Sequence, residues 1–350
     1  MPAPVPPLPA EDLDHVLAHT RNLWAGAKGA TFFITGGTGF FGMWLLESFA
    51  RANDALALGM RAVVLTRDPA AFAQKAPHLA ARADLVLHQG DLRTFAFPAG
   101  QFAFVIHAAS DTTPSPAGID PGLVRDAIVA GTERVLAFVA HAGTRKLLLT
   151  SSGAVYGPQP PGLTHIPEDY TGRPATGYGQ GKQRSEELCL ELGRRQGCEV
   201  KIARCFAFVG PHLPQGAHYA IGNFLRDALS GGPIRVAGDG TPRRSYLYAA
   251  DLAIWLWTIV FAAPAGRIYN VGSDDDQSIA THAQRVSEAA GGKIPVQVAL
   301  APDPAQPVLR YVPAINRASH ELGLAVRIPL DEAIQRTIAW HNASQAAKPL

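Results

Sequence analysis

Short apolar runs alternate with longer stretches of helical spacing between residues 30 and 208. The runs predict strands, and the stretches between them, where apolar residues recur every three or four positions, predict helices. Because the runs are almost wholly apolar, both faces of each strand are expected to be buried, which is typical of an α/β fold with a doubly wound parallel sheet. The predicted strands are 31–35, 62–66, 85–88, 103–107, 146–150 and 200–208, and the predicted helices are 40–53, 123–142 and 179–195.

The pattern changes on either side of this region. Residues 1–28 are an N-terminal extension, with a proline-rich stretch and one amphipathic helix (11–25) expected to pack on the outside, so that the ordered core begins at Ala30. After residue 208 the chain is rich in proline and glycine, which predicts a smaller, loop-rich lobe. We therefore expect a main domain at 29–208, joined again by 246–272, a smaller lobe at 209–245 and 273–341, and a tail at 342–350.

Composition and charge narrow the function. The 350 residues carry a net charge of only +2, so nothing draws the whole chain toward nucleic acid or an anionic membrane. The longest apolar run, 252–263, is too short for a membrane span, which needs about 20 residues, and its tryptophans, Trp255 and Trp257, are predicted to lie in the core. Three cysteines without a pattern favour a reduced, cytoplasmic protein.

A glycine-rich loop follows the first predicted strand and opens the first helix. Glycines there allow a tight turn, a close approach of a pyrophosphate, and close packing of helix on strand, while the helix N-terminus offers free N–H groups to phosphate. An ordinary tight turn is the alternative, but the position at the start of a strand–helix–strand series favours a dinucleotide. The predicted contacts in this loop are Gly36, Gly39, Phe40, Phe41 and Gly42.

The end of the second strand bears on the choice of dinucleotide. NAD enzymes usually place an acidic residue there, whereas this chain has Thr66 and Arg67. An arginine can pair with a 2′-phosphate, which favours NADP; a solvated Arg67 neutralised by Asp68 is the alternative, and NAD stays open. Further cofactor contacts are expected at the ends of the next two strands: Asp91 and Leu92 near the adenine, and His107, Ala108 and Ala109 near a ribose.

Tyr178 and Lys182 lie four residues apart, at the start of the predicted helix 179–195. This spacing places the two side chains on one face of the helix. A nearby ammonium group favours the phenolate, and so it lowers the pKa of the tyrosine toward the range that is useful for acid/base catalysis. A surface pair on an amphipathic helix is the alternative. Ser151 and Ser152 end the fifth strand, at the sheet edge where ligands bind in open α/β folds, so their hydroxyls are candidates to hold a substrate oxygen.

The glycine loop, the strand-end serines and Tyr-x-x-x-Lys, in this order, resemble the extended short-chain dehydrogenase/reductase family, and within it the nucleotide-sugar epimerase/dehydratase group, over residues 30–341. The stretches 148–157, 243–252 and 269–272 support the resemblance. It implies a Rossmann-type sheet, a nucleotide-diphosphate sugar as substrate, and a homodimer formed through two long helices per subunit. It also implies residue roles: Tyr178 as acid/base, Lys182 on the nicotinamide ribose, Ser152 rather than Ser151 as the catalytic hydroxyl, and Arg244 and Asn223 on the diphosphate.

Departures from the family pattern limit the reaction. Similar dehydratases have an Asp-Glu pair directly after the catalytic residue and similar decarboxylases keep the glutamate, but this chain has Gly153 and Ala154. Ala207 and Ile128 also replace the asparagines common in the family. An epimerase is therefore the leading hypothesis, an NADPH-dependent 4-keto-sugar reductase is the alternative favoured by Arg67, and a non-catalytic dinucleotide sensor is disfavoured because Tyr178 and Lys182 are both present.

Two single residues, the histidine spacing and an acidic stretch are further candidates for a functional or a structural role. His212 is predicted to line the sugar pocket, with a surface loop as the alternative, and Arg310 is a second candidate for a phosphate clamp. The histidines lack metal-ligand spacing, so no metal is expected. Asp274, Asp275 and Asp276 are interpreted as a solvated turn and helix cap.

Overall fold

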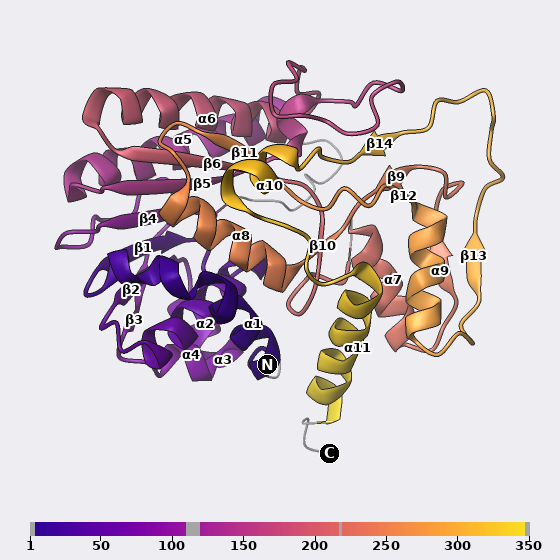
Figure 1. The fold of residues 1–350 in the computed structure, drawn as a ribbon, viewed down its shortest axis with the longest axis horizontal. Helices are drawn as coiled ribbons and strands as arrows, with labels where there is room; N and C mark the ends of the chain where they lie inside the picture. Colours follow the sequence, from indigo (N-terminus) through magenta and orange to yellow (C-terminus); the bar gives the residue numbers. More distant parts are fainter. Residues whose placement is uncertain (1–3, 110–119, 217–218, 347–350) are drawn as a thin grey trace.

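A seven-stranded sheet forms the centre of the protein in the computed structural model, which describes residues 4–109, 120–216 and 219–346 (Figure 1). Every neighbouring pair of strands in this sheet is parallel. The predicted doubly wound α/β fold is therefore confirmed. The strand order is β11 (Ile268–Val271), β6 (Glu199–Cys205), β5 (Lys146–Ser152), β4 (Phe104–His107), β1 (Thr31–Thr35), β2 (Arg61–Thr66) and β3 (Leu85–Gln89).

Helices cover both faces of this sheet (Figure 1). Long helices α5 (Pro121–Ala142) and α6 (Gly177–Gln196) pack against each other over one face, and α2 (Phe40–Ala55) and α8 (Ala249–Ala262) cover the other. Trp255 and Trp257 on α8 are fully buried, which confirms their predicted place in the core. The short helices α3 (Pro69–Lys75) and α4 (Pro77–Ala80) connect β2 to β3.

The smaller lobe lies at one end of the sheet, on the right of Figure 1. It contains α7 (Ala220–Leu229) packed on α9 (Ile279–Ala289), and the paired strands β8 (Ile234–Val236) and β13 (Val296–Val298). A three-stranded sheet of two-residue strands connects it to the main domain. The order of that sheet is β12 (Gln277–Ser278), β9 (Arg243–Arg244) and β14 (Arg310–Tyr311). The remaining elements are β7 (Phe208–Val209), β10 (Leu247–Tyr248), α10 (Asn316–Leu322) and α11 (Leu330–Ala346).

The N-terminal segment contributes side chains to the hydrophobic core, so the expectation of a core beginning at Ala30 is wrong. Its helix is amphipathic as expected, with one face buried and the rest exposed or half-buried. Its helix α1 (Ala10–Thr20) packs on α2 and α8, and a 3₁₀ turn, Arg21–Ala27, follows. Trp24 in that turn is fully buried, with its ring 4.6 Å from Trp257 and 5.0 Å from Phe261 between centroids. The aromatic partners lie more than 200 residues away, so no local pattern indicates this burial.

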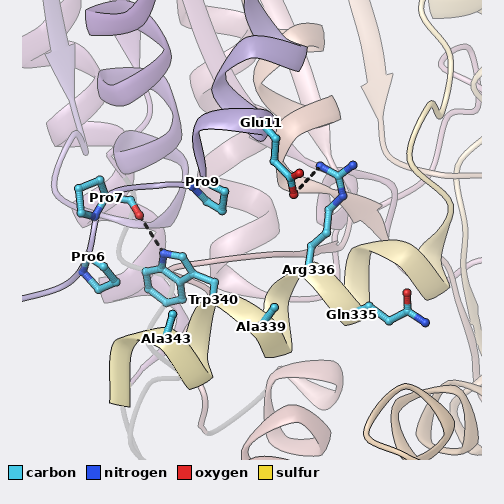
Figure 2. Close-up of a pocket in the computed structure, with 9 residues that line it drawn as sticks. All are labelled: Pro6, Pro7, Pro9, Glu11, Gln335, Arg336, Ala339, Trp340 and Ala343. Carbon is cyan, nitrogen blue, oxygen red and sulfur yellow. Dashed lines mark hydrogen bonds and ion pairs between the residues drawn. The ribbon is translucent and has the colours of Figure 1, made fainter. Parts of the chain in front are cut away.

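The last helix lies against the N-terminal segment. The indole nitrogen of Trp340 on α11 donates a hydrogen bond of 3.1 Å to the carbonyl of Pro7, and Arg336 pairs with Glu11 at 3.6 Å (Figure 2). The groove between the two segments contains none of the predicted site residues. Because α11 continues to Ala346, the predicted tail begins too early; residues 347–350 lie outside the described part. Within the described ranges, no helix combines the length and apolarity that crossing a bilayer requires.

Candidate functional site

The glycine loop joins β1 to α2 at the carboxyl edge of the sheet. Gly36 has a φ of +74°, and a Cβ there would lie 2.6 Å from the backbone of Ala108 and Ala109. A Cβ on Gly42 would lie 2.3 Å from the Gly36 carbonyl. Both positions therefore require glycine, the first for backbone conformation and contact, the second because the helix passes so close to the turn.

The N-terminus of α2 offers the donors that a pyrophosphate needs. The helix begins at Phe40 with exposed Gly39 as its N-cap, and no side chain caps the free N–H groups. The Lys75 ammonium group donates a hydrogen bond of 2.7 Å to the Thr38 carbonyl, which holds the loop from the side of α3. The loop thus fits a bound dinucleotide, as the sequence predicts.

Arg67 lies exposed just after β2. Asp68, the residue proposed as its neutralising partner, accepts a hydrogen bond of 2.9 Å from the Ala71 amide and caps α3. At the end of β3, Asp91 pairs with Arg93 at 2.9 Å, and hydrogen bonds from Arg93 lower the pKa of the Asp91 carboxyl. This edge of the site therefore presents two arginines around one carboxylate.

The His107 side chain does not face the cofactor region, although the residue ends β4 as predicted. Its ring nitrogens lie 2.8 Å from the Thr35 hydroxyl and 3.3 Å from the Thr132 hydroxyl, and Thr132 is 2.7 Å from the Ser185 hydroxyl. Burial lowers the pKa of His107 to about 3, so the imidazole is neutral. Its hydrogen bonds connect β1, β4, α5 and α6 inside the protein, whereas Ala108 and Ala109 directly after it are half-buried.

Tyr178 and Lys182 lie on the same face of α6, as the four-residue spacing predicts. The Lys182 ammonium nitrogen is 6.0 Å from the centroid of the Tyr178 ring and donates a hydrogen bond of 2.9 Å to the Thr150 carbonyl on β5. The α6 N-terminus is fixed by Thr176, whose hydroxyl accepts from the Gly179 amide at 3.0 Å. Lys182 is buried and Tyr178 is partly exposed, so this pair is not a surface pair.

The two strand-end serines turn in different directions, because successive side chains of a strand point to opposite faces. The Ser151 hydroxyl donates a hydrogen bond of 2.5 Å to Glu186, which also pairs with Arg204 at 2.7 Å. The Ser152 hydroxyl accepts instead a hydrogen bond of 3.2 Å from the Ala154 amide, and the Ser152 side chain lowers in part the pKa of Tyr311, whose hydroxyl lies beside Gly153. Of the two serines, Ser152 is therefore the one beside the Tyr178 region.

The buried ammonium group of Lys182 makes stability depend on pH. Burial lowers its pKa from 10.5 to about 8, so between these values the unfolded chain binds the proton and the folded protein does not. The free energy of unfolding of the wild type is expected to rise relative to that of Lys182→Met as pH increases from about 8 to about 10. Urea unfolding of both proteins across this range measures the difference, and parallel curves would contradict the assignment.

Arg244 and Arg310 lie on opposite faces of the three-stranded sheet. In the pairing of β9 with β14, Arg244 is opposite Tyr311 and Arg243 is opposite Arg310. The Arg244 guanidinium lies 5.7 Å from the centre of the Tyr311 ring, whereas Arg243 and Arg310 both pair with Asp276 on the other face. Arg310 therefore lies on the opposite face of this sheet from Arg244 and pairs with a carboxylate, and its contact with a phosphate stays a prediction.

Arg244 is well suited to an anionic ligand. It is half-buried, and burial lowers the pKa of its guanidinium, while no carboxylate among the described residues pairs with it. Asn223, the other predicted diphosphate contact, lies in the first turn of α7 and accepts a hydrogen bond of 3.0 Å from Arg226. The contact of Asn223 with a ligand stays a prediction.

His212 belongs to a buried group elsewhere, so its prediction as a sugar-pocket residue is wrong. Its side chain is 2% exposed, lies 3.8 Å from Glu47 and packs on Trp340, with 4.8 Å between ring centroids. Burial alone raises the pKa of Glu47, but the nearby His212 and His78 side chains lower it overall. The acidic stretch is also engaged: Asp275 and Asp276 pair with arginines, and Ser278 caps α9. Asp274 is exposed as expected of a solvated turn, whereas the cap of α9 is Ser278 rather than one of the aspartates.

One central residue of the site has no role in the sequence motifs. Tyr311 contacts Ser152 and packs on Arg244 and on Phe206, whose ring centroid is 4.7 Å away. No pattern in the sequence marks this tyrosine, because it stands alone in a two-residue strand. Among predicted cofactor contacts, Leu92 packs on Gly131 of α5 and Phe41 packs on Phe208.

The model of the NAD-dependent epimerase/dehydratase family matches residues 32–272. The chain belongs to this family. Among curated relatives, UDP-glucuronic acid decarboxylase 1 of Xenopus tropicalis is 29% identical over 243 residues, which are 67% of this chain and 56% of the relative. UDP-glucuronic acid decarboxylase 1 of Arabidopsis thaliana is 26% identical over 322 residues, covering 90% of this chain and 70% of the relative. The chain thus spans little more than half of the Xenopus protein.

Solved structures of epimerases have the same fold. The UDP-glucose 4-epimerase of Thermus thermophilus, in complex with NAD, is 25% identical with a TM-score of 0.73, covering 90% of this chain and 99% of that chain. The UDP-glucose 4-epimerase of Thermotoga maritima, with UDP-glucose, is 17% identical with a TM-score of 0.75, covering 90% and 99%. These findings support an NAD-dependent enzyme of this family and leave its particular reaction open.

Proposed function

We propose that the protein is a nucleotide-sugar epimerase that uses Tyr178 as acid/base. The observation that carries this proposal is the group formed by Tyr178, Lys182 and Ser152 at the sheet edge next to the glycine loop. When bound, NAD(P) supplies reversible hydride transfer at a sugar carbon. Tyr178 accepts the proton of the hydroxyl on that carbon and later returns it, while the Ser152 hydroxyl holds the same oxygen.

The Lys182 cation and the Arg244 guanidinium have different roles: the first acts on Tyr178, and the second on the diphosphate of the substrate. Lys182, held by the Thr150 carbonyl, favours the phenolate of Tyr178 and so assists proton removal. Arg244, buried without a carboxylate partner in the described part, suits the diphosphate of a nucleotide sugar. A nucleotide anchored through its diphosphate leaves the sugar able to turn between the two hydride transfers, and Asn223 is a further candidate contact.

Gly153 and Ala154 argue against elimination of water and against decarboxylation. Similar dehydratases have two carboxylates at these positions and similar decarboxylases have the second, whereas neither residue here carries an acid. The curated relatives quoted above are named decarboxylases, so UDP-glucuronic acid belongs in every assay. Because the matched relatives are less than 30% identical, this local difference weighs more than the overall likeness.

A panel of nucleotide sugars tests the proposal. The purified protein is incubated with UDP-, dTDP-, CDP- and GDP-hexoses, their 4-keto derivatives and UDP-glucuronic acid, with product mass and nicotinamide absorbance as readouts. Epimerisation is expected to give a new product that separates from the substrate on chromatography, has unchanged mass and forms with no net change of absorbance; absence of any such product would contradict the proposal. Loss of carbon dioxide or of water would contradict the proposal.

A 4-keto-sugar reductase using NADPH is the second candidate, because Arg67 is exposed and its neighbour Asp68 is engaged as a helix cap. If Arg67 holds a 2′-phosphate, Arg67→Ala is expected to weaken NADP binding about 10- to 100-fold, the loss of one charged hydrogen-bonding pair, and to leave NAD binding unchanged. Fluorescence titration measures both. Arg61→Ala, an exposed arginine at the other end of β2, is the control. An equal effect on NAD and NADP would remove the basis for this candidate.

We also expect a homodimer formed through α5 and α6, and a cytoplasmic location. The two helices are the longest in the described part and lie together on one face of the main domain. Light scattering checks the dimer. The three cysteines are buried and unpaired, which suits a reducing compartment.

A further inference from the structure

Tyr311 lies at the centre of the site. Its ring is held between Phe206, with 4.7 Å between ring centroids, and the Arg244 guanidinium, 5.7 Å from the ring centroid. These contacts direct the hydroxyl toward the end of β5, where Ser152 and Gly153 lie. The residue reaches this place from β14, more than 150 residues after β5 in the chain.

The hydroxyl of Tyr311 fills the space that a side chain at position 153 would need. A Cβ on Gly153 would lie 2.7 Å from the Tyr311 hydroxyl oxygen and 2.8 Å from the Phe206 ring. Real Cβ atoms essentially never approach so closely. The chain therefore has either a side chain after Ser152 or the hydroxyl of Tyr311 in this place, and it has the tyrosine.

The same hydroxyl lies beside Ser152, because it occupies the place of a side chain on the next residue, Gly153. Burial raises the pKa of Tyr311 above its usual value, although the Ser152 side chain lowers it in part, so Tyr311 stays protonated over the working range. Tyr178 lies near enough to act electrostatically on Tyr311. The Ala154 amide donates a hydrogen bond of 3.2 Å to the Ser152 oxygen. The Ser152 hydroxyl is therefore placed between the Ala154 amide and the Tyr311 hydroxyl.

We propose that Tyr311 is a positioning residue for Ser152: standing beside Gly153, its hydroxyl fixes the Ser152 hydroxyl in the orientation that holds the reacting sugar oxygen for Tyr178. The inference rests on the proposed use of Ser152 and Tyr178, but not on which sugar is turned over. It assigns a function to a tyrosine that no motif includes. It also gives a physical reason for glycine at position 153.

Tyr311→Phe tests the role, because it removes the hydroxyl and keeps the ring between Phe206 and Arg244. The expected result is a kcat lower by about 10- to 100-fold, as for loss of one oriented hydrogen bond in the reacting state, with KM nearly unchanged. In a Ser152→Ala background the same change is expected to have little further effect. Gly153→Ala, which displaces the hydroxyl sterically, is expected to lower kcat in the same way. Tyr269→Phe, which loses a hydroxyl bonded to Glu321 outside the site, is the matched control.

Two readouts separate failure of this inference from failure of the proposed function. The double-mutant cycle is measured both in kcat, with whichever sugar of the panel is turned over, and in the free energy of unfolding of the dinucleotide-bound protein. Independent effects of Tyr311→Phe and Ser152→Ala in kcat would overturn the positioning role, and so would absence of coupling in stability. If the wild type turns over no sugar, the proposed function fails, and the stability cycle alone decides the inference.

Discussion

Tyr178→Phe is expected to lower kcat by about 10²- to 10⁴-fold, the usual contribution of a positioned acid/base group. The change removes one oxygen from a partly exposed ring on α6 and leaves Lys182 bonded to the Thr150 carbonyl. Dinucleotide binding through the glycine loop is therefore expected to persist. Turnover of the best substrate in the panel, together with fluorescence titration of the cofactor, measures both quantities.

Tyr269→Phe serves again as the control, since it removes a tyrosine hydroxyl of the same sheet domain without reaching this group. Its kcat is expected to match the wild type. A Tyr178→Phe protein that binds the cofactor and turns over substrate at a near-normal rate would show that another group moves the proton. The proposed function would then lose the observation that carries it.

Trp24→Ala is expected to have the largest effect on stability, lowering the free energy of unfolding by about 3–5 kcal/mol. The indole is fully buried against Trp257 and Phe261, and its nitrogen donates a hydrogen bond of 3.0 Å to the Thr20 hydroxyl. Removal leaves a cavity between the N-terminal segment and α8, which the rigid core fills only in part. Urea unfolding at neutral pH measures the loss.

Leu300→Ala provides the comparison, because Leu300, which follows β13, is 61% exposed and its truncation is expected to change stability by less than about 0.5 kcal/mol. A Trp24→Ala protein as stable as this control would show that residues before Ala30 add little to the core. That result would restore the view that the sequence pattern suggests.

Local patterns predict the sheet and the arrangement of Tyr178 and Lys182 because both depend on residues near one another in the chain. β1 has the predicted bounds, and α6 places the two side chains on one face as the spacing requires. The sequence alone does not show which of the two strand-end serines faces Tyr311. That choice depends on the register of β5 in the sheet.

The failures share a different cause. Trp24 is buried against Trp257, which lies more than 200 residues later in the chain. His212 contacts Glu47, which lies on a helix about 160 residues earlier. The central place of Tyr311 could not be predicted, because the two faces of a two-residue strand cannot be told apart in the sequence until the pairing of that strand is known. Long-range contacts, rather than weak motifs, limit what the sequence reveals here.

Ion pairs stabilise the small sheet that holds Arg244 and Tyr311. They lie on its opposite face, where Asp276 pairs with both Arg243 and Arg310. Strands of two residues have few backbone bonds of their own, so this ionic brace helps set the tilt of the ligand-facing wall. Substitutions at positions 243, 276 and 310 are therefore expected to shift the side chains of Arg244 and Tyr311 without replacing either of them.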